Sequence, residues 1–154
     1  MIIKPVPEPL ISFSVFDIES ELKVSSAHRH PEQTKEFIVQ AENDGYEVII
    51  AMAGLSAALP GVVAAHSNLP VIGVPLPAAL GGMDALLSTV QMPAGIPVAT
   101  VAIGKAGAKN AAYLAAQILA SQDPELAQKL RDERAANAKT IVAKDAALQE
   151  SLKG

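Results

Sequence analysis

Two short, almost entirely apolar segments constrain the fold of this chain more than any other feature. Residues 48–51 and 71–74 contain only Val, Ile, Ala and Gly, and a helical pattern follows each of them. Strands that are apolar on both sides are typical of a parallel sheet, because helices cover both of its faces. A strand followed by a helix, repeated along the chain, therefore predicts an α/β fold with a central parallel sheet.

The other elements follow from the same patterns, and the whole chain, residues 1–154, is expected to form a single domain. Strands are expected at 20–25, 46–51, 70–75 and 97–103. Helices are expected at 31–44, 59–66, 81–90 and 111–121, with a long C-terminal helix from Pro124 nearly to Lys153. A glycine-rich turn is expected at 104–110. Residues 1–17 are rich in proline and predict at most a short edge strand at 11–16.

Composition narrows the possible partners. The formal net charge is −4 and aromatic residues make up 3% of the chain, so neither a basic stripe nor a base-stacking surface is expected. No apolar stretch is long enough to span a membrane. The chain has no cysteine, which rules out disulfide and thiolate chemistry and fits a cytoplasmic location. We therefore expect neither a nucleic-acid partner nor a membrane partner.

Candidate chemistry gathers in the loops that follow the expected strands. The carboxyl ends of parallel strands form one rim, where ligands bind in open α/β sheets. Small residues in three of these loops leave backbone N–H groups open to an anion. Arg29 offers a fork of donors suited to phosphate, and His28 can move a proton near neutral pH. Together they predict a phosphorylated small molecule that undergoes proton transfer.

Each of these features also has a purely structural interpretation. A single histidine on a loop is more often hydrogen-bonded or simply exposed than catalytic, and Arg29 could equally make a surface ion pair. His28 and His30 have no cysteine or acidic partner at ligand spacing, so no metal site is expected. Residues 104–107 do not form a phosphate-binding motif of the GxxxxGK[ST] type.

Several segments, taken in order, resemble one known family. They are Ser26–Arg29, Ala53–Gly61, Leu69–Pro75, Gly82–Ser88, Val90–Pro93, Gly95–Ile103 and Ala108–Ala112. No single motif is decisive, but the ordered set is specific and covers roughly residues 16–135. The chain is similar to the 5-(carboxyamino)imidazole ribonucleotide mutases, the small carboxylase-type subunit of purine biosynthesis.

The resemblance implies a flavodoxin-like three-layer fold, assembled as a homo-octamer with active sites at subunit junctions. It implies migration of a carboxylate from the exocyclic nitrogen to the ring carbon of a phosphorylated aminoimidazole ribonucleotide, with no metal, biotin, ATP or other cofactor. His28 matches the family's general acid and base. The substrate-binding positions that the resemblance implies are Ser26, Ala27, Arg29, Ala53, Gly54, Ser56, Ala57 and Leu59.

Two departures from the family pattern keep other hypotheses open. Family members begin with a strand and a Gly-Ser-x-Ser-Asp turn that binds phosphate and ribose, and no such turn precedes His28. Ala58 stands where the family has a second histidine, and Met52 stands where it has a glycine. One alternative is a non-catalytic or truncated member that keeps only the octameric shell. Another is a carboxylase that uses aminoimidazole ribonucleotide and carbon dioxide directly.

Overall fold

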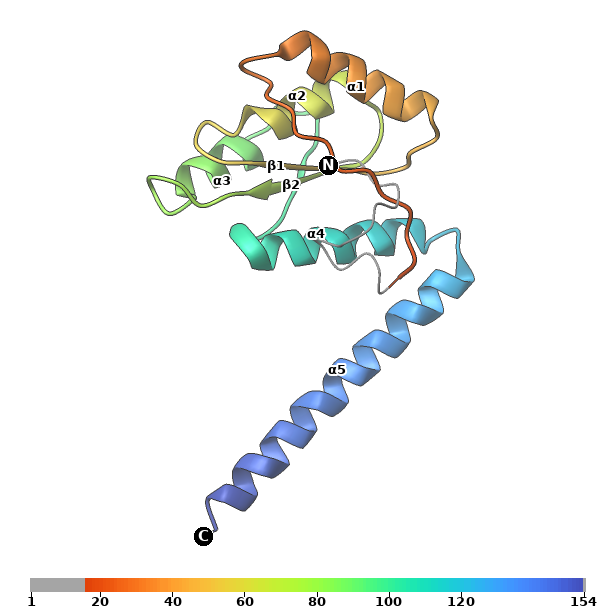
Figure 1. Ribbon diagram of the computed structural model, residues 1–154, viewed down its shortest axis with the longest axis vertical. Coiled ribbons are helices and arrows are strands. Elements are labelled where there is room, and N and C mark those ends of the chain that lie inside the picture. Colours follow the sequence, from red (N-terminus) through yellow and green to blue (C-terminus); the bar gives the residue numbers. More distant parts are fainter. Residues whose placement is uncertain (1–15, 154) are drawn as a thin grey trace.

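A parallel sheet of three short strands lies at the centre of the computed structural model, which describes residues 16–153 (Figure 1). The strands are β1 (Ile49–Ala53), β2 (Val71–Pro75) and β3 (Ala99–Thr100), in the order β1-β2-β3. The register pairs Ile49 with Val71. The two apolar segments that predicted a buried parallel sheet are therefore neighbouring strands within it.

Helices cover both faces of this sheet, as the sequence predicts. On one face lie α1 (Pro31–Asn43), α2 (Ala58–His66) and α3 (Met83–Val90), and on the other lies α4 (Gly104–Leu119) (Figure 1). Side chains alternate accordingly along β1. Ile49 packs with α1 and α2, whereas Ile50 packs against the alanines of α4. The result is a three-layer arrangement of helices, sheet and helix.

Gly73 in β2 allows the helices to lie close to the sheet. A Cβ at this position would collide with Cγ2 of Thr89 in α3 and lie 2.8 Å from Cγ1 of Val98. It would also lie 3.4 Å from Cβ of Pro60 in α2. Glycine here therefore sets the spacing between β2 and the layer that contains α2 and α3.

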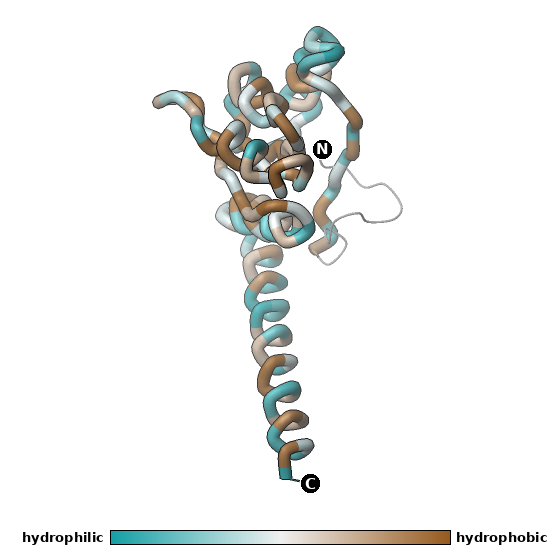
Figure 2. The backbone as a smooth tube through the Cα atoms, turned by 90° about the vertical axis from the view of Figure 1, so that its left-hand side faces the viewer, coloured by the Kyte–Doolittle hydropathy of each residue, from teal (hydrophilic) through white to brown (hydrophobic). Residues whose placement is uncertain are grey.

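The C-terminal helix α5 (Pro124–Ser151) extends away from the body of the molecule (Figures 1 and 2). Asp123 caps it by accepting the N–H groups of Glu125 and Leu126 at 2.9 and 3.0 Å. Leu126 is buried, but every residue from 134 to 153 is exposed. Apolar and polar residues alternate along it (Figure 2). None of the described helices combines the length and apolar character that a membrane crossing requires.

The expected strand at 20–25 is not formed. These residues have no regular secondary structure and pair with no strand in the described part of the chain, and Val24 is 91% exposed. A strand needs the backbone of a neighbour, and alternation alone does not supply one. The segment makes a side-chain hydrogen bond instead, in which Tyr46 Oη donates to Glu21 Oε2 at 3.1 Å.

The expected glycine-rich turn at 104–110 is also wrong, because these residues form the first two turns of α4. Gly104 starts the helix at a φ of +72°, and Gly107 allows its backbone to approach the carbonyl of Ala102. The glycines therefore serve close packing within a helix. The strand expected at 97–103 is also shorter than expected, because only β3 is formed. Val101 N–H donates to Gly73 O at 3.1 Å, and after this residue the chain turns toward α4.

Three smaller boundaries differ from expectation. The helix expected at 81–90 begins at Met83, because Gly81 and Gly82 have φ values of +64° and +91°. The strand expected at 46–51 is β1, displaced toward the carboxyl end. The possible edge strand at 11–16 lies outside the described residues except for Phe16, which is buried edge-on against Tyr113.

Candidate active site at the carboxyl edge of the sheet

The loops of interest lie at one edge of the molecule. The chain leaves β1 and β2 at the left of Figure 1, and α1, α2 and α4 begin at the same side. This is the edge to which the carboxyl ends of the parallel strands point, where open α/β sheets bind ligands. The structure therefore brings the turn before α1 and the loop after β1 to a common edge.

The turn formed by Ser26–His30 carries the predicted catalytic histidine. Ser26 O accepts the N–H groups of Arg29 and His30 at 3.2 and 2.8 Å, which closes the turn. Ser26 and Ala27 are half-buried, whereas His28 and Arg29 are exposed. The turn follows a segment outside the sheet, so it is the start of α1 that places His28 at this edge.

The loop after β1 holds the other predicted substrate-binding residues. Leu55 and Ala57 have φ values of +54° and +32°, a conformation that is costly for residues with a Cβ and is often found at functional sites. Ala57 N–H donates to Gly54 O at 3.0 Å. Ala57 is buried, Ser56 is exposed, and Ala53, Gly54 and Leu59 are half-buried.

Gly54 brings this loop against the loop that follows β2. A Cβ at Gly54 would lie 3.4 Å from Leu76 O and 3.9 Å from Cβ of Ala78. Leu76 N–H also donates to Ala53 O at 2.8 Å, which extends the pairing of the two strands to the edge of the sheet. The strained backbone of the β1–α2 loop is therefore supported by its neighbour.

Three of the helices that follow strands of the sheet begin without a side-chain cap. The N-cap residues are Ala57 for α2, Gly82 for α3 and Ile103 for α4, and none of them caps its helix with a side-chain hydrogen bond. The first N–H groups of an α-helix have no partner within that helix. These groups and the helix dipole favour a negatively charged ligand.

The side chains of His28 and Arg29 are available to a ligand. Neither has a hydrogen-bond or ion-pair partner among residues 16–153. An imidazole can donate and accept protons, and a guanidinium can bind phosphate with two parallel bonds. The pair matches the predicted chemistry, but one copy of the chain leaves His28 open to solvent.

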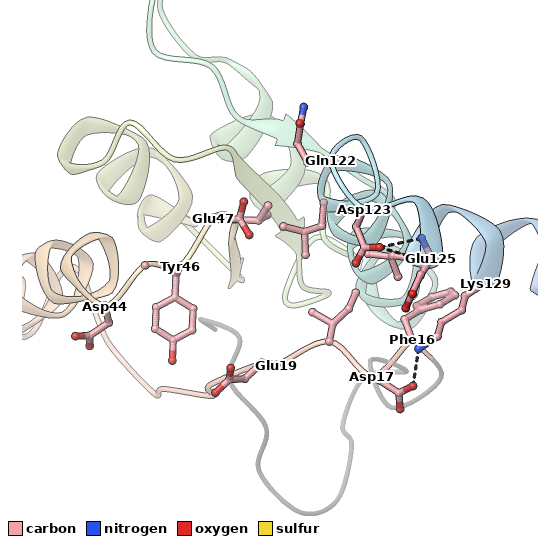
Figure 3. Close-up of a pocket in the computed structure, with 15 residues that line it drawn as sticks. Phe16, Asp17, Glu19, Asp44, Tyr46, Glu47, Gln122, Asp123, Glu125 and Lys129 are labelled. Atoms are coloured by element: carbon pink, nitrogen blue, oxygen red, sulfur yellow. Dashed lines mark hydrogen bonds and ion pairs between the residues drawn. The ribbon is translucent and has the colours of Figure 1, made fainter.

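Three cavities of the described chain lie away from His28. One of about 520 Å³ lies near the start of β1 and the end of α4, with Glu47, Asp123 and Lys129 in its wall (Figure 3). Burial, helped by Glu21, raises the pKa of Tyr46 in this wall to about 12. Because this cavity lies near the start of β1, it is at the opposite end of the strands from His28.

A second cavity, of about 720 Å³, lies between α4 and α5. Tyr113 donates to Glu133 across it, and burial raises the pKa of this tyrosine. A third, of about 430 Å³, is mainly apolar and lies beside the start of β2. Within the described residues, no group of three or more His, Asp or Glu side chains is arranged to hold a metal ion.

Sequence reasoning missed the bonds that hold the turn before α1. Ser25 Oγ lies 2.6 Å from Thr34 Oγ1, and His30 caps α1 by accepting Gln33 N–H at 3.2 Å. Pro31 at the first helical position does mark the preceding residue as the N-cap, which was a usable signal for His30. The contact between Ser25 and Thr34 depends on the path of the turn and has no signal in the sequence.

Fold and site together define a class: a three-layer α/β protein whose candidate ligand site lies at the carboxyl edge of a parallel sheet. Comparison with known families narrows this class. The model of the AIR carboxylase family matches residues 8–140, and the chain belongs to that family.

Known relatives agree with this assignment. An N5-carboxyaminoimidazole ribonucleotide mutase of Escherichia coli K12 is 53% identical over 131 residues, 84% of this chain and 78% of the relative. The mutase of Bacillus subtilis is 57% identical over 127 residues, 82% of this chain and 78% of the relative. The crystal structure of Treponema denticola PurE matches with a TM-score of 0.80 and 33% identity, over 88% of this chain and 84% of that chain. The resemblance drawn from the sequence and the flavodoxin-like fold are thereby confirmed.

Proposed function

We propose that this protein interconverts N5-carboxyaminoimidazole ribonucleotide and 4-carboxy-5-aminoimidazole ribonucleotide in purine biosynthesis. Membership of the AIR carboxylase family and identities of 53% and 57% to proteins named as mutases support this. The observation that carries the proposal is the turn before α1. It holds the consecutive residues His28 and Arg29, whose side chains have no hydrogen-bond or ion-pair partner among residues 16–153, at the edge where such folds bind ligands.

In this reaction one bond to the carboxylate carbon breaks and another forms, with carbon dioxide released in between. His28, in its protonated form, gives a proton to the exocyclic nitrogen as the bond from that nitrogen to the carboxylate carbon breaks. The ring carbon then attacks the released carbon dioxide and forms the new carbon–carbon bond. His28 removes the proton from this ring carbon, which restores the aromatic ring and returns the imidazole to its starting form.

The remaining predicted residues hold the substrate in this proposal. Arg29 and the hydroxyl of Ser26 bind the phosphate side, and Ser26 Oγ can still donate its hydrogen because it acts as the acceptor in its bond with Arg29 N–H. Ala27 lies within the same turn. The loop Ala53–Leu59 forms the wall around the migrating carboxylate, with Ala53, Gly54, Ser56, Ala57 and Leu59 as its contacts. The uncapped N-terminus of α2 favours negative charge beside this wall.

An ultraviolet assay of imidazole carboxylate formation tests the proposal. Purified protein is given the N5-carboxylated ribonucleotide, and in a parallel reaction the unsubstituted ribonucleotide with bicarbonate. We expect rapid conversion only in the first reaction. Turnover restricted to the second would identify a direct carboxylase, and no turnover in either would identify a non-catalytic family member.

We also propose that the working form is a cytoplasmic homo-octamer, with each site completed by neighbouring copies. Exposed apolar side chains support self-association. Met83, Leu87 and Val90 are 47–52% exposed, and their spacing along α3 places them on one face. Leu80, in the loop before α3, is 67% exposed. On the projecting part of α5, Ile141, Val142, Leu148 and Leu152 are 54–71% exposed. Exposed apolar side chains gathered on one helix face are typical of interaction surfaces, and a copy seated beside α3 would enclose the open edge that carries His28.

A further inference from the structure

The turn that carries His28 is connected by hydrogen bonds to α1 on its far side. Thr34 lies one helical turn after His30 and is only 1% exposed. Its Oγ1 donates to His30 O at 3.0 Å and lies 2.6 Å from Ser25 Oγ. Ser25, which precedes the turn, and His30, its last residue, are thus joined through the hydroxyl of Thr34.

The direction of these bonds follows from the number of protons. A hydroxyl group has a single hydrogen to donate. Thr34 uses its hydrogen on the carbonyl of His30, so the short contact requires Ser25 to be the donor. The order is therefore Ser25 to Thr34 to the backbone of His30, and removal of the Thr34 hydroxyl breaks both of these side-chain bonds while the bond from Thr34 N–H to His30 O remains.

His30 adds a third point of attachment. Its Nδ1 accepts the N–H of Gln33 at 3.2 Å, as an N-cap does. This role needs the tautomer with its proton on Nε2. The side chain of His30 is thereby committed to α1, although it lies two residues from His28.

We propose that Ser25, Thr34 and His30 form a clamp that positions His28 and Arg29 for the reaction. The inference rests on the proposed function and assigns residues that the resemblance does not. The clamp residues do not touch the substrate. They fix the turn between two points, and orientation of a reacting group to within about 1 Å is worth up to about 10²-fold in rate.

The test compares kcat and KM of three variants with those of the unmodified protein. Thr34→Val keeps the shape of the side chain and removes the hydroxyl, Ser25→Ala removes only the donor, and Thr34→Ser restores the hydroxyl. We expect Thr34→Val and Ser25→Ala to lower kcat by about tenfold, within the range for a misplaced group. Thr34→Ser, which keeps the hydroxyl, should have a kcat close to that of the unmodified protein.

Ser121→Ala is the matched control. Ser121 Oγ donates to Ile118 O at 2.7 Å at the end of α4, so this variant also removes a hydroxyl that bonds to a helix carbonyl. It should leave kcat and KM within twofold of the unmodified protein. All assays are run well below the unfolding temperature of each variant, so that a change in stability alone does not change kcat.

The outcomes separate the clamp from the proposed function. If Thr34→Val and Ser25→Ala keep full kcat while His28→Asn is inactive, the clamp is refuted and the reaction stands. If His28→Asn is fully active, the role of His28 as acid and base fails, whereas an inactive unmodified protein in the ultraviolet assay refutes the proposed function itself. Should Thr34→Val not fold, Ser25→Ala decides alone, because it leaves the bond from Thr34 to His30 intact.

Discussion

His28 is the residue on which the proposed proton transfers depend. Replacement by asparagine keeps a similar size and a polar side chain but removes the group that exchanges protons. General acid–base catalysis is worth about 10²–10⁴-fold, so kcat of His28→Asn should fall by at least about 10². His66→Asn is the control, because His66 is an exposed histidine at the other end of α2. Steady-state kinetics of both variants provides the measurement, and equal losses in the two would contradict the assignment.

Arg29 is expected to act mainly on binding. A hydrogen-bonded pair with a charged partner is worth about 1.5–3 kcal/mol, so Arg29→Ala should raise KM by roughly 10- to 100-fold. Lys35→Ala removes one positive charge from the exposed side of α1 and serves as the control. An unchanged KM for Arg29→Ala would show that the guanidinium does not contact the phosphate.

Tyr46 gives a prediction about stability at alkaline pH. Burial and the bond to Glu21 raise its pKa from 10.0 to about 12, so the folded state holds the phenol proton more tightly than the unfolded state. This contribution is complete below pH 10 and is lost as the pH rises to about 12. Urea unfolding at pH 8 to 12 should show Tyr46→Phe losing less stability over this range than the unmodified protein. Parallel curves would mean that Tyr46 does not titrate in this way.

For single residues, the sequence predicts the candidate reactive groups better than the residues that hold them in position. His28 and Arg29 are chemically distinctive residues next to a helix start, so they can be found by their chemistry and position. Ser25 and Thr34 are common residues nine positions apart, and their 2.6 Å contact exists only because the turn folds back on α1. Such a contact depends on three-dimensional geometry that no short motif encodes.

The elements show where local pattern is sufficient and where it fails. β1 and β2 were predictable because strands buried on both faces need unbroken apolar residues. The segment 20–25 has a strand-like alternation and forms none, because no neighbouring strand in the described chain pairs with it. Residues 104–110 contain two glycines and still form helix. The role of Gly107 is close packing, because a Cβ there would collide with the carbonyl of Ala102.

Gly73 offers a test of how tightly the layers pack. Gly73→Ala would place a Cβ against Thr89 and Val98, and overpacking of this kind costs about 1–3 kcal/mol. Thermal or urea unfolding should therefore show a clear loss of stability. Adding Thr89→Ser removes the colliding methyl group and should recover part of the loss.

Gly61 is the matched control for this prediction. It lies inside α2, and a Cβ there would lie 3.4 Å from the flexible Sδ of Met92. Alanine is about 1 kcal/mol more favourable than glycine within a helix, so Gly61→Ala should be neutral or stabilising. A loss of stability equal to that of Gly73→Ala would refute the packing argument.

On the scale of the whole molecule, a single copy leaves its apolar surface and its candidate site both uncovered. The exposed face of α3 is made of residues three and four apart, and α5 carries further apolar residues away from the body. His28 is exposed in the same copy, whereas carbon dioxide released during the proposed reaction must be kept from escaping into water. The proposed association of copies would cover both.

Leu87 on α3 provides the test of this association. The side chain is 52% exposed in one copy, and Leu87→Glu would place a charge in any interface that covers it. Light scattering should give a mass well above 15.9 kDa for the unmodified protein and a lower mass for Leu87→Glu. Its kcat should fall together with the mass, because the site then loses its enclosure. Val39→Glu, at a single exposed position on α1, should change neither quantity. A fully active unmodified protein that scatters light as a single chain would refute the association, and the enclosed site with it.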